Sequence, residues 1–172
     1  MATVEKAVDA YRFLPPSLAA WVRSFIGEKE FQGAIPWIPL GKPLSQATMA
    51  MVTSAGMSLK TDLPFDMERE KREAVWGDRS YRAIPKGTTG DDIDVNHLHI
   101  NTSWIKKDIN VMLPFARMAE FEAEGVIGRL APTSYSFYGF QWQNTEFLQT
   151  AIEPMCKGMK DEGVDGVLLF PA

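Results

Sequence analysis

The stretch Glu162–Ala172, EGVDGVLLFPA, decides how the chain is organised. Its four consecutive apolar residues, Val167 to Phe170, are too few for a helix, and the turn signals Gly163 and Asp165-Gly166 come before them. Such a run predicts a fully buried parallel strand. Ligands of open α/β sheets gather beyond the carboxyl ends of the strands, so we expect a site at and just after Ala172.

A second strand is predicted over Ala47–Thr53, ATMAMVT, and a turn of small residues, Ser54 to Gly56, follows it. Small residues at a strand end let a ligand or a neighbouring backbone approach closely, although an ordinary tight turn has the same composition. Ser54 and Gly56 are therefore candidate substrate-binding residues. We expect both strands to be buried and parallel, with Gly56 and Ala172 at one edge of the sheet.

Composition limits the function classes. The chain has 172 residues, 45% of them hydrophobic, which is enough for one globular domain with a core. Its net charge of -4 and isoelectric point near 5.2 disfavour binding to nucleic acid or to anionic membranes through bulk charge. No apolar run is long enough to span a bilayer, and the first residues lack the apolar core of a secretory signal. We expect a cytoplasmic protein without a nucleic-acid or membrane partner.

The remaining patterns predict an α/β fold with a short, mainly parallel sheet covered by helices. This single domain covers residues 35–172, and a helical N-terminal arm, interrupted at Pro15-Pro16, precedes it over residues 1–34. Helices are predicted over 114–123 and 144–160. The charged run Asp66–Arg79 is predicted to be a solvated helix or surface loop, because both signs of charge are interspersed. The aromatic run Tyr135–Phe140 beside Gly139 indicates a core edge or a pocket wall.

The histidines lie close together in the segment Asp91–His99, DDIDVNHLH. Strand alternation would place His97 and His99 on one face, as neighbours. Such a pair suits proton transfer, contact with a substrate carboxylate or metal binding, and hydrogen-bonded histidines at a sheet end are the plain alternative. No third ligand stands at a fixed spacing, so we predict no metal site and keep His97 and His99 as catalytic candidates.

Cys156 is the only cysteine, which excludes an internal disulfide and a cysteine-cluster metal site. It falls within the helix predicted over 144–160. We predict a buried small hydrophobic residue there and not a catalytic thiol, because no sequence cue for activating a thiol lies nearby.

Nearly all of the chain after Ile35 resembles the selenoprotein B family of glycine, sarcosine, betaine and D-proline reductases. The resemblance is carried by five segments in a fixed order: PWIPLGKPLSQATMAMVTSAGMSLK, SYRAIP, DVNHLH, KKDINVMLPFARMAEFEAEGVIGRLAPTSYSFYG and EGVDGVLLFPA. Their succession and spacing are specific to that family.

The resemblance implies reductive cleavage of a carbon–nitrogen bond in an amino acid or its N-methyl derivative. It also implies a partner subunit whose pyruvoyl group binds the amine, and no cofactor bound by this chain itself. In the family, a selenocysteine or a cysteine follows the strand that corresponds to Gly166–Ala172, so the nucleophile is expected just after Ala172. Asp108 and Asn110 in KKDIN match the family's pattern, as do His97 and His99, and are candidate substrate-binding residues.

Three functions are compatible with these patterns. The first is a subunit of such a reductase that is truncated before its reactive residue, in which case the gene continues through a UGA codon. The second is a non-catalytic binding or assembly subunit. The third, a cofactor-independent racemase or isomerase, is weakened by the absence of two suitably placed cysteines. An uncovered terminal strand leaves apolar surface exposed, so we expect an oligomer that is inactive alone.

Overall fold

The computed structural model describes residues 10–26, 38–73, 76–98, 100–141 and 144–172. The chain divides into two compact units, Met1–Ile38 and Pro39–Ala172. In the first unit, the described residues form a 3-10 helix, η1 (Ala10–Phe13), and the helix α1 (Pro16–Ile26). Proline suits the first position of a helix, where its missing N–H costs nothing, so the predicted break at Pro15-Pro16 is confirmed. The predicted boundary after residue 34 falls outside the described residues.

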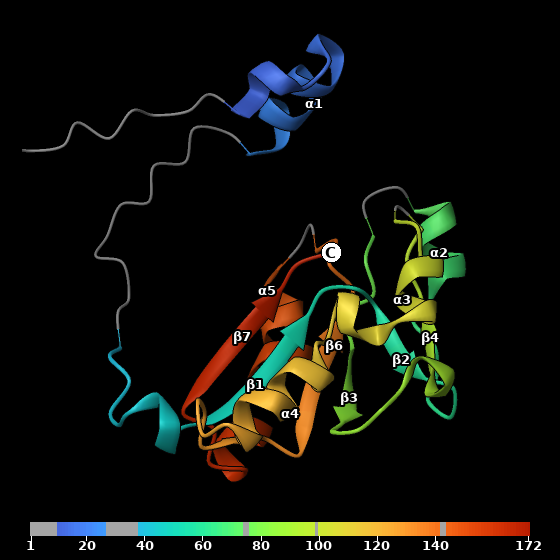
Figure 1. The fold of residues 1–172 in the computed structure, drawn as a ribbon. Helices are drawn as coiled ribbons and strands as arrows, with labels where there is room; N and C mark the ends of the chain where they lie inside the picture. The colour runs from blue at the N-terminus through green and yellow to red at the C-terminus, as the bar shows by residue number, and fades with distance from the viewer. Residues whose placement is uncertain (1–9, 27–37, 74–75, 99, 142–143) are drawn as a thin grey trace, which may run out of the picture. The chain divides into compact units, whose positions relative to one another are not determined.

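The second unit is built around the strand β1 (Thr48–Thr53), which is parallel to three other strands (Figure 1). The strand β7 (Gly166–Phe170) lies along one side of β1, in the register Met49↔Gly166 to Thr53↔Phe170. Along the other side run β5 (Arg129–Leu130) and then β6 (Thr133–Phe137). The strand β3 (Tyr81–Pro85) is antiparallel to β6 and forms the far edge. The predicted α/β fold with a mainly parallel sheet is confirmed.

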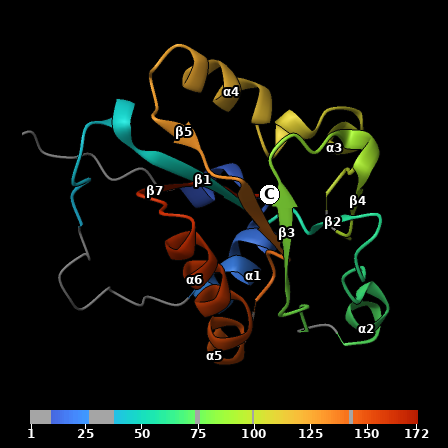
Figure 2. The ribbon, with the colours of Figure 1, turned by 90° about the horizontal axis from the view of Figure 1, so that it is seen from below.

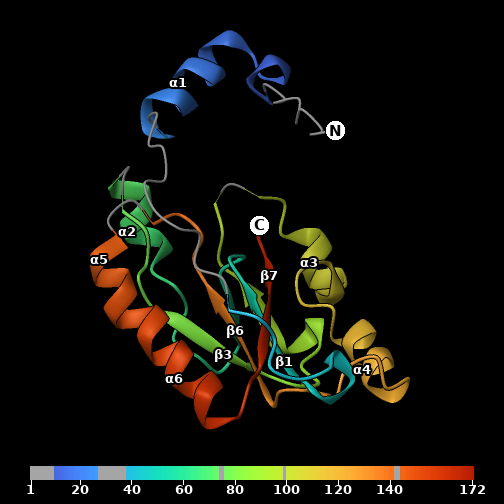
Figure 3. The same ribbon diagram turned by 90° about the vertical axis from the view of Figure 1, so that its left-hand side faces the viewer.

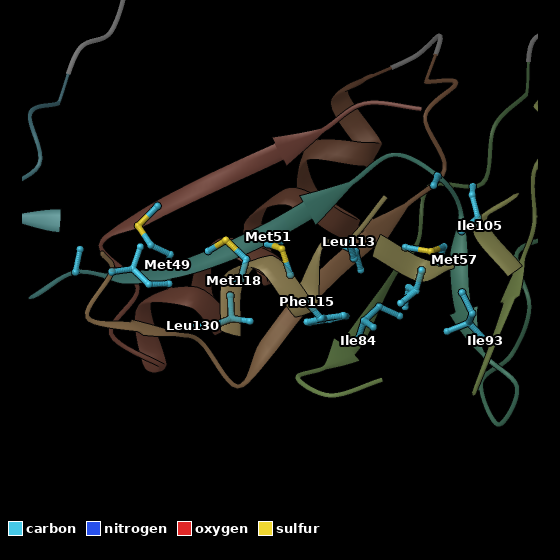
Figure 4. Packing of buried hydrophobic residues seen from close by; sticks show 14 residues of the cluster. Met49, Met51, Met57, Ile84, Ile93, Ile105, Leu113, Phe115, Met118 and Leu130 are labelled. Carbon is cyan, nitrogen blue, oxygen red and sulfur yellow. The ribbon is translucent and has the colours of Figure 1, made fainter. Parts of the chain in front are cut away.

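All six residues of β1 are buried, because helices cover both faces of the sheet (Figure 2). Alternate side chains of the strand enter two different cores. Met49 and Met51 pack on one face with Phe115 and Met118 of the helix α4 (Phe115–Ala123), as Figure 4 shows. Ala50 and Val52 pack on the other face. The helical residues of that second core are Phe147, Ala151, Met155 and Met159.

The helices of the second core run without a break from Asn144 to Asp161. They are α5 (Asn144–Phe147), a π-helix labelled η5 (Leu148–Ile152) and α6 (Glu153–Asp161). Pro154 lies in the first turn of α6, where its missing N–H disrupts the α-helical hydrogen bonding of the turn before it. The helices predicted over 114–123 and 144–160 are thus confirmed, the second with a π-helical turn before its proline.

The strand β7 is parallel to β1, as predicted, but the prediction that it is fully buried is wrong. Leu168 is 37% exposed and Leu169 is 73% exposed. Among the described residues β7 pairs with β1 alone, so its outer edge lacks a partner strand there (Figure 3), and much of its apolar surface is exposed. An apolar sequence indicates a strand's preference for the core, but the number of neighbouring strands decides its burial.

A small second sheet extends the fold beyond β1. The strand β2 (Met57–Leu59) is antiparallel to β4 (Ile93–Val95). The helices around this sheet are α2 (Met67–Arg72) and α3 (Ser103–Lys107). The 3-10 turns of the second unit are η2 (Leu44–Gln46), η3 (Gly90–Asp92) and η4 (Ile109–Val111). Within the described ranges, every helix is too short or too polar to cross a lipid bilayer.

Candidate functional site

The strands β1 and β7 end at one edge of the sheet, where the sequence predicts a site. The backbone N–H of Ala172 donates to Ser54 Oγ at 2.9 Å, and the N–H of Ser54 donates to the carbonyl oxygen of Phe170 at 3.3 Å. Gly139, which follows β6, also lies here, since a Cβ at this residue would stand 3.1 Å from the Ser54 carbonyl oxygen. The predicted shared edge of the first turn and Ala172 is therefore confirmed.

An apolar cavity of about 310 Å³ opens at this carboxyl-end edge. Its lining residues are Val52, Ser54, Phe137, Leu169, Phe170 and Pro171. The Ser54 hydroxyl is the one polar side-chain group among them. A cavity of this size and chemistry accommodates a small apolar group beside a single hydrogen-bonding group.

Gly56 occupies a position that only glycine tolerates. Its φ is +62°, and a Cβ there would stand 2.3 Å from the Asn96 carbonyl oxygen. The Gly56 carbonyl oxygen accepts from the Asn96 N–H at 2.8 Å and from Asn96 Nδ2 at 3.2 Å. Asn96 Nδ2 also donates to Ser58 Oγ at 2.9 Å. The glycine thus lets the segment containing the histidines dock onto the turn after β1.

His97 lies beside this turn, outside the strand predicted for it. The strand β4 ends at Val95, so the alternation expected over residues 93–99 does not extend to His97, and that part of the prediction is wrong. The imidazole is half-buried, with its ring centroid 5.1 Å from that of Tyr138 and the planes tilted by 46°. His99 lies outside the described residues, so its candidacy stays a prediction.

Tyr138 and Glu70 form a buried polar pair that the sequence did not indicate. The phenol of Tyr138 donates to Glu70 Oε1, and the backbone of Leu98 lies near the same phenol. Burial raises the pKa of Tyr138, and the hydrogen bond to Glu70 raises it further, so this phenol stays neutral. Glu70 corrects the prediction of a solvated charged run, because it is the one buried residue of α2.

Asp108 and Asn110 form a capping network of their own. Asp108 Oδ1 accepts from the Asn110 N–H at 3.0 Å and from Asn110 Nδ2 at 2.8 Å, and these bonds lower the pKa of Asp108. Asn110 Oδ1 in turn accepts from the N–H of Ala116 at 2.8 Å, in the first turn of α4. Both side chains therefore have a structural role at the start of helices.

These two residues line a different cavity from the one at Ser54. It measures about 410 Å³, and its walls are Lys86, Gly87, Thr88, Thr89, Gly90, Lys107, Asp108, Ile109, Asn110, Phe115, Ala116 and Ala119. The turn at 86–90 follows β3, whose Pro85 pairs with Thr133 at the amino end of β6. The structure thus brings Ser54, Gly56 and His97 together and places Asp108 and Asn110 in a separate site.

Cys156 is exposed on α6, so the prediction that it is buried is wrong. Met155 and Met159 fill the positions of α6 that face the sheet, and Cys156 is turned by about 100° from Met155 toward solvent. Across the described parts of the chain, no three His, Cys, Asp or Glu side chains come close enough to hold a metal ion.

Glu70, Asn96 and Tyr138 are parts of this edge that were not predicted from the sequence. The aromatic run Tyr135–Phe140 was the usable signal, since it predicted a core edge or a pocket wall beside Gly139. For Asn96, the available signal was its position directly before the candidate residue His97. Nothing in the alternating charges around Glu70 distinguished it from its exposed neighbours.

Comparison with known proteins gives three curated relatives. The chain is 35% identical over 133 residues to D-proline reductase subunit gamma of Acetoanaerobium sticklandii. This match covers 77% of this chain and 52% of that protein. It is 30% identical over 137 residues to glycine reductase complex component B subunit gamma of Carboxydothermus hydrogenoformans, covering 78% of this chain and 30% of the relative. It is also 30% identical over 128 residues to betaine reductase complex component B subunit beta of Peptoclostridium acidaminophilum. That match covers 74% of this chain and 28% of the relative.

The chain thus matches about half of the first relative's length and less than a third of the others'. No solved structure matches it. Residues 30–171 match the family described as glycine/sarcosine/betaine reductase selenoprotein B, and this match covers most of the chain, including β1, β6, β7 and the edge at which they end. The chain therefore belongs to the selenoprotein B family of glycine, sarcosine and betaine reductases.

Proposed function

We propose that the chain is a subunit of an amino-acid reductase complex that cleaves a carbon–nitrogen bond through a selenol or thiol following Ala172. The observation that carries the proposal is the hydrogen bond from the Ala172 N–H to Ser54 Oγ, at the carboxyl ends of parallel strands. The next residue would enter the strand-to-loop junction beside the apolar cavity. A reactive nucleophile needs such an accessible position.

The chemistry is a two-step reduction. The selenolate or thiolate attacks the α-carbon of glycine, sarcosine, betaine or D-proline, a bond from selenium or sulfur to carbon forms, and nitrogen leaves with the electron pair of the broken bond. A second thiol then attacks the selenium or sulfur, and the released α-carbon takes a proton. The resulting selenenyl sulfide or disulfide carries the two oxidising equivalents, and an external dithiol reduces it.

The substrate and its amine-binding group define the partners. A pyruvoyl group on a partner subunit would bind the amine of a small amino acid or N-methyl amino acid, and this chain would contribute the strand-end edge with Ser54, Gly56 and His97. The names of the three relatives, each a subunit of a reductase or of a reductase complex component, support an assembly of this kind. Thiol and selenol chemistry favours the reducing cytoplasm.

A second candidate function is a non-catalytic binding or assembly subunit. Cys156 is the only cysteine of the sequence, and it is exposed on α6. Because other elements form the carboxyl-end edge, the thiol of this cysteine is not part of that edge. The apolar side chains exposed on β7 also suit contact with another subunit or a second copy of this chain.

One experiment separates the two candidates. The transcript is sequenced beyond the Ala172 codon, and the complex isolated from the native cell is alkylated and digested for mass spectrometry. An in-frame UGA or cysteine codon, and an alkylated selenocysteine or cysteine following Ala172, support the reductase. A UAA or UAG stop with no downstream frame containing a nearby cysteine overturns it and favours the assembly subunit.

A further inference from the structure

We infer that Glu70 and Tyr138 are positioning residues that hold the His97 imidazole at the carboxyl-end edge, where it donates a hydrogen bond to the substrate's α-carboxylate. This inference rests on the proposed function, because glycine, sarcosine, betaine and D-proline differ around the nitrogen but share that carboxylate. A group that recognises the carboxylate serves every one of these substrates.

The ring of Tyr138 has little freedom to move. Its residue is fully buried, and its backbone forms an antiparallel bridge with Ala55 in the turn after β1. Two glycines make room for the ring. A Cβ at Gly56 would stand 3.3 Å from Tyr138 Cδ2, and one at Gly77 would stand 3.4 Å from Cδ1. Tyr138 is therefore a fixed platform next to the Ser54–Gly56 turn.

The phenol oxygen connects this platform to two other segments. It donates to Glu70 on α2 and lies near the backbone of Leu98, the residue directly after His97. Burying a carboxylate is costly unless it is hydrogen-bonded, so Glu70 needs the phenol as much as the phenol needs Glu70. Loss of the carboxylate would leave the buried phenol O–H without this acceptor, on a ring that contacts His97.

The segment that contains His97 is held at the edge by its neighbour Asn96. Asn96 binds the Gly56 carbonyl oxygen through its N–H at 2.8 Å and through Nδ2 at 3.2 Å, and the backbone of Leu98 lies near the phenol. The imidazole itself lies against the ring of Tyr138 and stays half-buried. Imidazole carries an N–H donor in its neutral and its protonated form, so it suits a carboxylate in either state.

The positioning is tested by NMR on the full chain with three variants. Glu70→Leu removes the acceptor, Glu70→Gln keeps a carbonyl oxygen for the phenol, and Glu68→Leu changes an exposed neighbour in the same helix. The aromatic ring of Tyr138 shifts the NMR signals of the His97 imidazole. The chain has two histidines, and the signals that disappear in His97→Phe are those of His97. We expect these signals to move in Glu70→Leu and to stay in Glu70→Gln and Glu68→Leu. Unmoved signals in Glu70→Leu, with circular dichroism showing a folded chain, overturn the positioning.

The carboxylate contact is tested by kinetics of the full chain assembled with its partner subunits, using glycine, sarcosine, betaine and D-proline in turn. His97→Phe keeps the aromatic packing and loses the N–H, whereas His97→Gln keeps a donor. A contact made equally in the ground state and the transition state alters KM alone. We expect KM to rise roughly tenfold to a hundredfold in His97→Phe with kcat within about threefold, and far less in His97→Gln.

The outcomes separate the inference from the proposed function. A fall in kcat at constant KM in His97→Phe overturns the carboxylate contact. Equal KM values in Glu70→Leu and Glu68→Leu overturn the link from Glu70 to substrate binding. A wild-type complex that turns over none of the four acids overturns the proposed function and with it the carboxylate contact, while the NMR comparison still decides the positioning.

Discussion

The backbone N–H of Ala172 donates a hydrogen bond to Ser54 Oγ at 2.9 Å, across a sequence separation of 118 residues. This bond joins the end of β7 to the turn after β1. It fixes where the chain leaves the sheet, and any residue after Ala172 starts from that point.

Substitution of Ser54 by alanine should loosen this junction. The variant loses the acceptor for the Ala172 amide, and we expect the free energy of unfolding to fall by about 1 kcal/mol. Urea unfolding of the two proteins measures the difference. Ser45→Ala, at an exposed serine of η2, is the control and should leave stability unchanged. Equal stability of Ser54→Ala and wild type would show that the bond contributes nothing.

Gly56→Ala should be far more costly. The new Cβ would stand 2.3 Å from the Asn96 carbonyl oxygen on a backbone with a φ of +62°, so we expect a loss of more than about 2 kcal/mol. Gly87→Ala separates the two causes, because Gly87 has a φ of +90° with open space around its Cβ position, and it should cost about 1 kcal/mol. Thermal unfolding that ranks Gly87→Ala as the worse variant would contradict the close approach at Asn96.

The raised pKa of Tyr138 predicts a loss of stability at high pH. Its phenol binds its proton more tightly in the folded chain than in the unfolded one, so this stabilisation is complete below about pH 10, the ordinary tyrosine pKa. It is lost as pH rises above that value. Tyr138→Phe removes the titrating group, and its unfolding free energy should fall less steeply between pH 9 and 11, a range set by the ordinary pKa of about 10. Urea unfolding across that range measures the two slopes, and parallel slopes would refute the prediction.

Asn110 offers a test of capping against substrate binding. Asn110→Ala removes the acceptor of the Ala116 N–H, and we expect the chain to lose about 1 kcal/mol of stability. Asn110→Asp retains an acceptor oxygen and should recover most of the loss. A KM of the assembled complex that changes in Asn110→Ala but returns in Asn110→Asp would show that the cap also shapes the second cavity. An unchanged KM in both variants would remove Asn110 from the substrate-binding candidates.

Leu169 tests the expected self-association. Its side chain is 73% exposed on the outer strand of the sheet, so Leu169→Lys should weaken concentration-dependent association without lowering stability. Analytical ultracentrifugation at several concentrations measures this. Leu63→Lys, at a leucine that is 82% exposed in the loop between β2 and α2, is the matched control. Association that persists equally in both variants would exclude β7 as the contact.

The sequence was informative where a side chain's role follows from its own neighbours in the chain. The apolar run at Val167–Phe170 predicted a parallel strand, and the small residues at Ser54–Gly56 predicted a turn at the same edge, because strand length and turn chemistry are local properties. The burial of β7 was not predictable in this way, since it depends on how many strands flank it.

The parts of the site that were missed share one cause. Glu70 is hydrogen-bonded to a residue 68 positions away, and its own surroundings in sequence are those of a solvent-exposed helix. The separation of Asp108 and Asn110 from Ser54 likewise follows from β3 being antiparallel to its neighbour. No periodicity or motif reports such long-range pairings.

During synthesis, the central strand β1 is made long before its partner strand β7. The Thr48 N–H donates a hydrogen bond to Asp165 Oδ2 at 2.8 Å, across 117 residues. At 5–20 residues per second, the central strand therefore leaves the ribosome about 6 to 23 seconds before its outer neighbour. Throughout that interval the sheet is incomplete, so the methionine and valine side chains of β1 cannot be fully buried. A nascent chain of this kind is a natural client for a chaperone that binds short apolar segments, and slower translation between β6 and β7 would lengthen its dependence on one.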